Sequence, residues 1–308
     1  MKSKYLLLTL ALLGTMAAIF TMSALRPPVV TTPGKPTIVT TFYPLADIAQ
    51  NVSRKHMEVI NITPAGVEPH DFEPTPQDLA KIYRAKLFIL NGGDIDAWAE
   101  KIIPELKAKN ITVINMSEHL EKIQDTNAES EPKLYDPHFW LDPINVSTET
   151  DVIAETLVQI DNARAVDYNN NRAAFKKQLQ QLDTDYRTGL AACDSKEIIT
   201  AHNAFGYLTK RYNLTNFYIL GLSPDEEPSP QKIAEIASMA KQKNIKYIFF
   251  ETIIDQKLSR TIADEIGAQT LVLNPIEGLT DEELRAGKNY IQVMKDNLQN
   301  LKTALVCP

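Results

Sequence analysis

The feature that most constrains the fold is a long stretch in the middle of the chain without helix-breaking residues. Residues 148–192 contain no proline and a single glycine, Gly189. Apolar side chains recur in it at helical spacing: Phe175, Leu179, Leu182 and Tyr186. The pattern predicts one long helix over 166–192, with another helical segment across 151–160 before it. We expect the long helix to join two folded halves.

Segments typical of strands alternate with helical segments on both sides of this stretch. Runs rich in β-branched and aromatic residues predict strands within 37–42, 56–64, 86–93, 111–116, 196–202, 215–221, 245–251 and 268–275. Helical spacing predicts helices within 44–53, 75–85, 95–108, 203–213, 229–244, 255–267 and 281–305. Strand–helix alternation is typical of parallel βαβ units. The fold class predicted is therefore α/β, with two lobes that each contain a mostly parallel sheet flanked by helices.

The predicted domain boundaries follow from these patterns. They are a signal peptide or N-terminal anchor (1–25), a proline-rich linker (26–36), an N-terminal α/β lobe (37–165), the linking helix (166–192) and a C-terminal α/β lobe (193–308). The first segment has Lys2 and Lys4 before an apolar run, as secretory signals do. Extended to Leu25, the run reaches the roughly twenty residues that can span a membrane, so an uncleaved anchor is the alternative. Both readings place the body outside the cytoplasm, in the periplasm or cell envelope.

Charge and cysteine content bear on three properties: nucleic-acid binding, lipid anchoring and disulfide formation. The chain has 308 residues and a net charge of −7, whereas nucleic-acid binding requires clustered Lys and Arg, so we expect no nucleic-acid partner. No cysteine follows the N-terminal apolar run, so we expect no lipoprotein anchor. The two cysteines, Cys193 and Cys307, can pair in an oxidising compartment, or they are two unrelated thiols.

Three of the five histidines and one glutamate occupy comparable loops. His70 and Glu277 each follow a predicted strand, and His202 ends one. His138 lies in the stretch "YDPHFWLDP", in which prolines restrict the backbone. Ligands of open α/β sheets bind beyond the carboxyl ends of the strands. Each of these residues is more than 60 positions from the next, which excludes a local finger motif and suits a site between two lobes.

Three imidazoles and a carboxylate form a near-tetrahedral ligand set that suits Zn²⁺. Each residue also has an ordinary explanation: a turn residue (His70), a buried turn (His138), a helix cap (His202) and an exposed acid (Glu277). We interpret the remaining histidines, His56 and His119, as surface residues.

Acids near these histidines are candidates to orient them, because metal-bound histidine usually donates its second N–H to a carboxylate or carbonyl. The sequence does not rank the candidates, which are Asp71, Asp136, Asp142 and Glu251. We expect Phe139 and Trp140 to pack beneath His138 and exclude water.

From about residue 36 to 305, the chain resembles the zinc- and manganese-binding solute-binding proteins of ABC transporters, also called the cluster 9 or cluster A-I family. The resemblance rests on "TFYPLADIAQNV", "GVEPHDFEPTPQDLAKIYRAKLFILNG", "DPHFWLDP", "TAHNAFGYL" and "LNPIEGLT". It implies two α/β lobes joined by one long rigid helix, and metal ligands at His70, His138, His202 and Glu277. Manganese-type relatives usually have Glu at the third and Asp at the fourth position, so His202 and Glu277 favour zinc. The His-rich loop of many zinc-type relatives is replaced by the short acidic segment 126–135.

The expected function is that of a monomeric, extracytoplasmic, high-affinity zinc receptor that delivers metal to an ABC permease. A four-ligand site without an open position indicates binding, whereas a catalytic zinc keeps a water. Three alternatives remain: a manganese or iron receptor of the same family, a zinc-dependent hydrolase with Glu277 as general base, and a cell-surface adhesin. The hydrolase lacks an HExxH pair and a nucleophile elbow, and no extra adhesive module is evident. The long helix predicts limited lobe closure, with metal released through loop movement.

Overall fold

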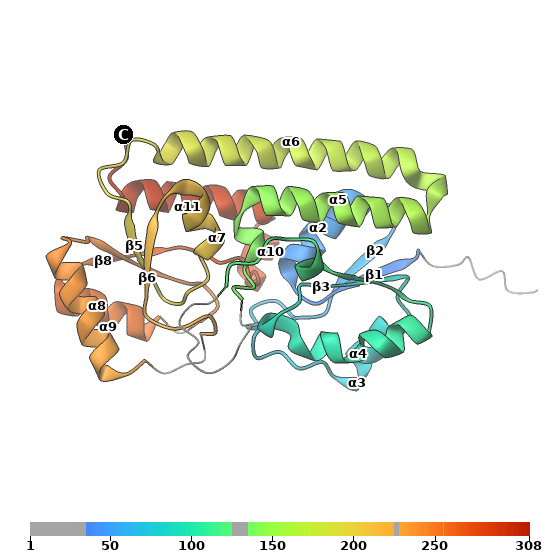
Figure 1. Ribbon diagram of the computed structural model, residues 1–308, viewed down its shortest axis with the longest axis horizontal. Coiled ribbons are helices and arrows are strands. Elements are labelled where there is room, and N and C mark those ends of the chain that lie inside the picture. The colour runs from blue at the N-terminus through green and yellow to red at the C-terminus, as the bar shows by residue number, and fades with distance from the viewer. Residues whose placement is uncertain (1–34, 125–134, 225–227, 255) are drawn as a thin grey trace, which may run out of the picture. The chain divides into compact units, whose positions relative to one another are not determined.

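The first half of the chain is built on a parallel sheet (Figure 1). Its strand order is β2-β1-β3-β4. Its strands are β1 (Thr37–Thr40), β2 (Glu58–Asn61), β3 (Leu87–Leu90) and β4 (Thr112–Asn115). Its helices are α2 (Tyr43–Ser53), α3 (Pro76–Ile82) and α4 (Ala97–Ala108). Alternate strand residues serve different cores: Ile38 packs with α2, whereas Val39 packs with α3 and α4. The sheet is therefore covered on both faces, as parallel sheets usually are.

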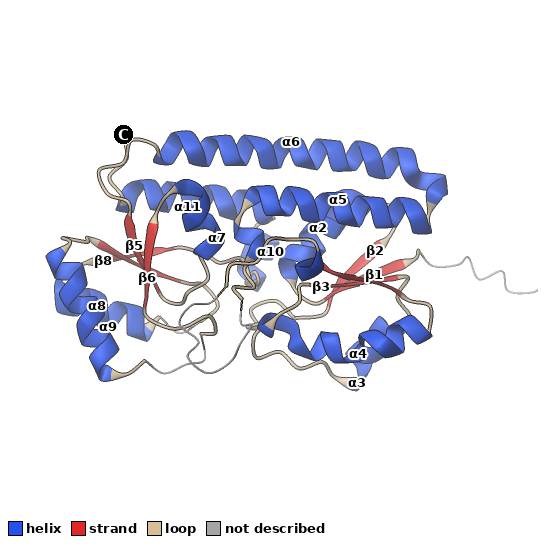
Figure 2. Ribbon diagram, in the orientation of Figure 1, coloured by secondary structure: helices blue, strands red, loops and turns tan. Residues whose placement is uncertain are grey.

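The second half contains two parallel strand pairs (Figure 2). Strand β5 of one pair contacts β7 of the other. The pairs are β5 (Glu197–Thr200) with β6 (Thr215–Tyr218) and β7 (Tyr247–Phe250) with β8 (Gln269–Val272). The helices are α7 (Gly206–Tyr212), α8 (Pro230–Gln242), α9 (Lys257–Ile266), α10 (Asp281–Arg285) and α11 (Tyr290–Ala304). Each predicted strand is thus confirmed, and so is the α/β fold class.

The structure is a computed structural model that describes residues 35–124, 135–224, 228–254 and 256–308. Residues Pro36–Pro308 belong to one compact unit. The predicted signal or anchor segment, nearly all of the linker and most of the acidic segment lie outside the described residues. None of the helices in the described ranges combines the length and apolarity that crossing a membrane requires.

Two long helices follow the first sheet in the chain. Helix α5 (Pro143–Ile160) starts at Asp142, whose carboxylate accepts a hydrogen bond from the Ile144 N–H (2.8 Å), and Pro143 suits the first turn. Helix α6 (Ala165–Leu190) confirms the predicted long helix. Helices α2, α5, α6 and α11 share one apolar core, to which β1 and β7 also contribute. The two halves are therefore joined by packing as well as by the chain.

The C-terminal helix differs from its prediction. A single helix was expected over 281–305, but a turn separates α10 from α11. Gly287 adopts a φ of 73° there, which ends the first helix, and Asn289 caps the second by accepting from the Gln292 N–H (3.0 Å). Apolar spacing continues through the turn, so periodicity alone did not show the break.

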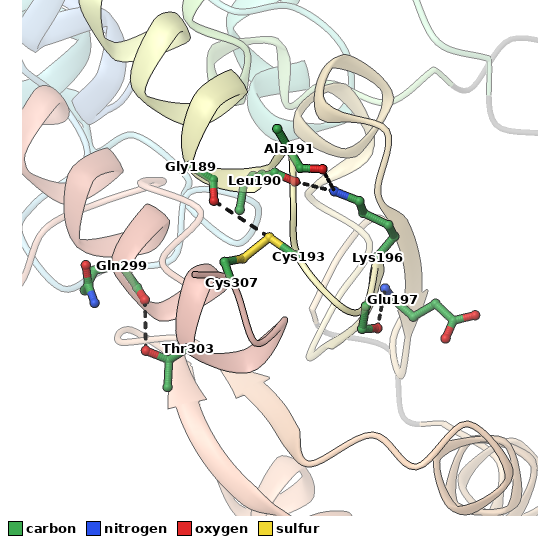
Figure 3. The surroundings of a disulfide bond; sticks show 10 residues. Gly189, Leu190, Ala191, Cys193, Lys196, Glu197, Gln299, Thr303 and Cys307 are labelled. Atoms are coloured by element: carbon green, nitrogen blue, oxygen red, sulfur yellow. Dashed lines mark hydrogen bonds between the residues drawn. A yellow bond between two sulfur atoms is a disulfide. The ribbon is translucent and has the colours of Figure 1, made fainter.

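The two cysteines form a disulfide (Figure 3). The Cys193–Cys307 bond joins the segment after α6 to the end of the chain, 114 residues further on. Two backbone hydrogen bonds run beside it, from the N–H of Asp194 to the carbonyl of Val306 and from the N–H of Ser195 to the carbonyl of Leu305. The structure thereby decides between the two alternatives that the sequence left open.

Candidate metal centre

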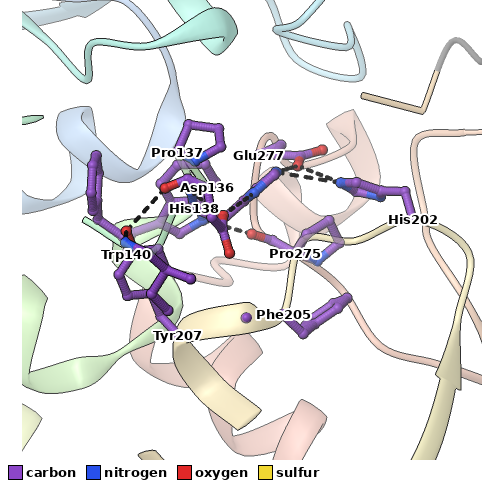
Figure 4. Close-up of polar contacts among 12 residues, drawn as sticks. Asp136, Pro137, His138, Trp140, His202, Phe205, Tyr207, Pro275 and Glu277 are labelled. Carbon is purple, nitrogen blue, oxygen red and sulfur yellow. Dashed lines mark hydrogen bonds and ion pairs between the residues drawn. The ribbon is translucent and has the colours of Figure 1, made fainter. Parts of the chain in front are cut away.

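Four loops bring the predicted site residues together. His70 lies in the loop between β2 and α3, His138 precedes the short 3₁₀ helix Phe139–Leu141, His202 follows β5, and Glu277 follows β8. One ligand atom from each of them lies within 4.8 Å of the others. Figure 4 shows three of the four, His138, His202 and Glu277, converging from separate segments. The site therefore draws two residues from each half of the chain.

The distances among these atoms suit a single small cation. Oε1 of Glu277 lies 3.1 Å from Nε2 of His138, 3.2 Å from Nε2 of His202 and 3.8 Å from Nε2 of His70. The Nε2 atoms of His138 and His202 are 3.4 Å apart. A tetrahedral zinc with bonds of about 2.0–2.1 Å places its ligand atoms roughly 3.3 Å apart. The donor set and its spacing fit zinc with small adjustments, the largest at His70.

Asp136 orients the ring of His138. Its Oδ1 accepts hydrogen bonds from the backbone N–H of His138 (2.9 Å) and from the ring at Nδ1 (2.7 Å). The other ring nitrogen, Nε2, is thereby directed toward Glu277. Both bonds use one oxygen of a buried carboxylate, so the ring direction and the backbone turn are coupled.

The segment around His138 is held from both halves of the chain. The side-chain amide of Asn91 donates to the carbonyl of Pro137 (2.9 Å), and the indole N–H of Trp140 donates to the carbonyl of Pro275 (2.7 Å). Phe139 and Trp140 are fully buried, and the Trp140 ring lies 5.3 Å from the His138 ring. The prediction that these aromatics pack beneath His138 and exclude water agrees with this arrangement.

His202 is oriented in the same way by a residue distant in the sequence. Oε1 of Glu251 accepts from its backbone N–H (3.3 Å) and from the ring at Nδ1 (2.7 Å). Glu251 directly follows β7, the neighbour of β5, from which His202 emerges. Adjacent strand ends therefore supply the ligand and the acid that orients it.

The four candidate acids have different roles. Asp136 and Glu251 contact the site histidines, as described above. Asp142 instead caps α5 and forms an ion pair with Arg211, and Asp71 is exposed. The sequence named the right acids among others but had no means of separating them.

Glu68 was missed in the sequence, although its spacing is a signal. It precedes His70 by two positions in an acid–proline–histidine order, as Asp136 precedes His138. Its Oε1 accepts from the backbone N–H of His70 (3.3 Å). Burial, together with repulsion from Glu277, raises the pKa of Glu68 to about 9. Burial and the neighbouring carboxylate therefore favour the protonated form of this acid in the metal-free protein.

The pKa values of the other buried groups of the site are shifted by their charged neighbours. Burial alone would raise the pKa of Glu277, but attraction to His202 and hydrogen bonds from both facing histidines hold it well below the usual range. Burial opposes charge on His202, yet Glu251 and Glu277 outweigh it and hold its pKa well above 6.5. The pKa of His138 is raised for the same reason, by Asp136 and Glu277. An incoming cation must therefore displace protons from the histidines.

The two remaining histidines lie elsewhere. His119 is exposed, as predicted. The interpretation of His56 as a surface residue is wrong, since its side chain is only 6% exposed. Its ring lies 2.7 Å from an oxygen of Asp167 and 3.0 Å from a nitrogen of Arg164, which connects the loop after α2 to the start of α6.

Fold and site together define a class: two-lobed α/β binding proteins with a buried cluster of histidine and carboxylate ligands between the lobes. Residues 38–304 match the model of the ZnuA family, described as zinc-uptake complex component A, periplasmic. The chain belongs to this family. The resemblance noted in the sequence is thus confirmed on its zinc-type side.

Known relatives agree in sequence and in structure. The high-affinity zinc uptake system protein ZnuA of Bacillus subtilis is 40% identical over 278 residues, which are 87% of each chain. The zinc-binding lipoprotein AdcA of Streptococcus pneumoniae is 36% identical over 87% of this chain, but the match spans only 56% of AdcA. The crystal structure of the Zn(II)-bound ZnuA-like domain of S. pneumoniae AdcA has a TM-score of 0.77 and 36% identity, and the match covers 88% of this chain and 99% of that domain.

The family indicates the cellular compartment and the general role of its members. The family is a periplasmic one of zinc-uptake components, which act with a membrane transporter, and it is not a family of enzymes. The name lipoprotein for the pneumococcal relative is at odds with the expectation that this chain lacks a lipid anchor.

Proposed function

We propose that this protein is an extracytoplasmic receptor that binds one Zn²⁺ ion through His70, His138, His202 and Glu277 and delivers it to an ABC permease. The observation that carries the proposal is the buried cluster itself, in which four ligand atoms from four loops lie within 4.8 Å of one another. Zinc is the cargo, and the protein performs no chemistry on it.

Ligand chemistry supports zinc over manganese. Three imidazoles and one carboxylate oxygen are typical of tetrahedral zinc, whereas manganese favours octahedral sites rich in oxygen. Oε1 of Glu277 faces the Nε2 atoms of the histidines, which suits a ligand. A general base would instead have to face a metal-bound water, so this arrangement gives the hydrolase no support.

Limited lobe movement is part of the proposal. Helices α5, α6 and α11 share one apolar core to which both halves contribute. A wide hinge opening would expose that core to water. The free-energy cost would be roughly 25 cal/mol for each Å² of apolar surface exposed. We therefore propose that metal enters and leaves through movement of the ligand loops, with small tilts of the lobes. The lobes proposed are 37–165 and 193–308, with 166–192 as the linking helix.

The proposal includes a monomeric receptor with no nucleic-acid partner. The segment 1–25 would act either as a cleaved signal that exports the protein or as an uncleaved anchor that retains it in the envelope. The acidic net charge of −7 supports the absence of nucleic acid among the partners.

Calorimetric titration of the metal-free protein tests the assignment. Zn²⁺ should bind with 1:1 stoichiometry, and a large excess of Mn²⁺ or Fe²⁺ should fail to displace it. H138A should bind far more weakly, while H119A, which removes an exposed histidine, should match the parent. Undiminished zinc binding by H138A would refute the site, and displacement by equimolar Mn²⁺ would make the protein a manganese receptor.

A further inference from the structure

Helix α7 begins against the segment that carries His138. The helix starts at Gly206, four residues after His202, so the His202 loop leads directly into it. Its second residue, Tyr207, contacts the His138 segment through its hydroxyl, which accepts from the N–H of Ile123 (3.0 Å) and donates to the carbonyl of Asp136 (3.0 Å). Figure 4 shows Tyr207 beside Asp136 and His138. The backbone of Asp136 is thereby fixed to the start of α7.

Gly206 contacts the carboxylate of the same residue. A Cβ atom at position 206 would overlap Oδ2 of Asp136. Gly206 is not among the glycines with positive φ, so close approach rather than backbone conformation accounts for this glycine. The other oxygen of Asp136, Oδ1, holds the ring and the backbone N–H of His138. Any larger residue at 206 must therefore displace the carboxylate that orients His138.

We propose that Gly206 and Tyr207 are positioning residues of the zinc site, which hold Asp136 in place so that Nε2 of His138 faces the metal. The inference rests on the proposed zinc-binding function. Gly206 provides space for the carboxylate, and Tyr207 fixes the carbonyl of the same residue.

The arrangement also couples two ligands from different halves of the chain. His202 and Gly206 belong to one short connection, and Gly206 abuts the acid that orients His138. A displacement of the His202 loop at the start of α7 therefore shifts Asp136, and with it His138. The two histidines should lose their binding geometry together, so that release of the metal is concerted rather than one ligand at a time.

A double-mutant cycle on zinc affinity tests the proposal. G206A should weaken zinc binding about ten- to a hundredfold, the usual cost of losing a group that orients a metal ligand. G189A is the matched control, because a Cβ at this helical glycine meets only ordinary contacts (3.4 Å and beyond) and should leave affinity unchanged. D136A removes the atoms with which the new Cβ collides, so G206A should cost nothing further in the D136A background. An equal cost of G206A in both backgrounds would overturn the proposal.

Two further readouts separate positioning from a loss of folding. The visible absorption spectrum of the Co²⁺-substituted protein should change in G206A and Y207F but not in G189A, because it reports the geometry of the ligands. In the metal-free protein, the NMR signal of the His138 ring proton shared with Asp136 should shift or exchange faster in G206A. Parent-like spectra and affinity in G206A and Y207F would refute the positioning role, whereas a parent protein without zinc affinity would refute the proposed function itself.

Discussion

Two segments of the molecule have the same order of residues but different surroundings. Glu68-Pro69-His70 and Asp136-Pro137-His138 each place an acid two positions before a site histidine. In the second segment, the acid holds both the backbone and the ring of His138. In the first, the acid accepts from the backbone N–H of His70. The same short pattern therefore precedes both proposed ligands, and their geometry has to be read from the structure.

The two segments are hydrogen-bonded to different parts of the chain. The His138 segment is bonded to Asn91, Tyr207 and Pro275. The His70 loop is joined to the Glu277 loop by the hydrogen bond from the N–H of Gly66 to the carbonyl of Leu279 (3.0 Å). Of the three site histidines, His70 lies farthest from Oε1 of Glu277, at 3.8 Å against 3.1 Å for His138 and 3.2 Å for His202. From these distances we infer that His70 moves farther than His138 or His202 when the ion binds.

Removal of either ligand should have the largest effect on affinity. H138A and H70A should each weaken zinc binding by more than the ten- to hundredfold typical of a supporting residue. The loss should be greater for H138A. Asp136 already orients the ring of His138, so this ligand loses little entropy on binding and contributes more to the binding free energy. Chelator competition measures both affinities. Equal losses, or a greater loss for H70A, would contradict the difference between the two segments.

Zinc affinity should depend steeply on pH. The pKa values of His138 and His202 are raised in the metal-free site, so both hold protons at low pH and lose them only as pH rises. Each displaced proton changes the apparent affinity by about tenfold per pH unit, and binding should therefore weaken as pH falls. Calorimetry in buffers of different ionisation enthalpy counts the protons released. Release of no protons at pH 6.5 would show that the site histidines are already neutral.

The two acids should differ in their contribution. D136N removes the charge that orients His138 and should weaken zinc binding about ten- to a hundredfold. E68Q should change affinity little at pH 7, because the pKa of Glu68 is raised to about 9 and glutamine resembles its protonated form. Parallel zinc titrations of the two variants make the comparison. A loss in E68Q as large as that in D136N would show that Glu68 acts as an ionised group when zinc is bound.

Glu149, a buried acid of helix α5, should affect the stability of the protein and leave its zinc affinity nearly unchanged. Neither oxygen of Glu149 has a hydrogen-bond partner among the described residues, and burial, with repulsion from Asp142, raises its pKa to about 8. A carboxyl raised in the native state stabilises the fold fully below its unfolded pKa of about 4.5 and loses this contribution as pH rises toward 8. E149Q should therefore stabilise the protein at pH 8, by up to a few kcal/mol, but not at pH 4. Urea unfolding at both values measures this, and equal effects at the two pH values would contradict it.

Much of the fold could be predicted because it depends on local patterns. The parallel strands and helix α6 follow from β-branched runs and from a stretch without helix breakers. The four proposed ligands could be named because three of them follow or end predicted strands, whose carboxyl ends meet at one edge of an α/β fold, and because the motifs around all four resemble a metal-binding family. In contrast, Asp136 and Asp142 look alike in sequence, each preceding a proline in one short segment. The turn between them directs one carboxylate to His138 and the other to the start of α5.

Other features depend on contacts between distant segments. The pairing of Glu251 with His202 requires β7 to lie beside β5, and the burial of His56 requires α6 to pass over the loop after α2. The close approach of Gly206 to Asp136 is of the same kind. Such contacts leave no local pattern, so they became visible only in three dimensions.

X-ray absorption at the zinc edge of the zinc-loaded protein tests the central claim most directly. Four nitrogen or oxygen ligands at about 2.0–2.1 Å should be found, with the outer-shell scattering of three imidazole rings. H138A should lose the scattering of one ring. A parent spectrum with sulfur ligands, with six oxygen ligands or with fewer than three imidazoles would contradict the assignment of His70, His138, His202 and Glu277.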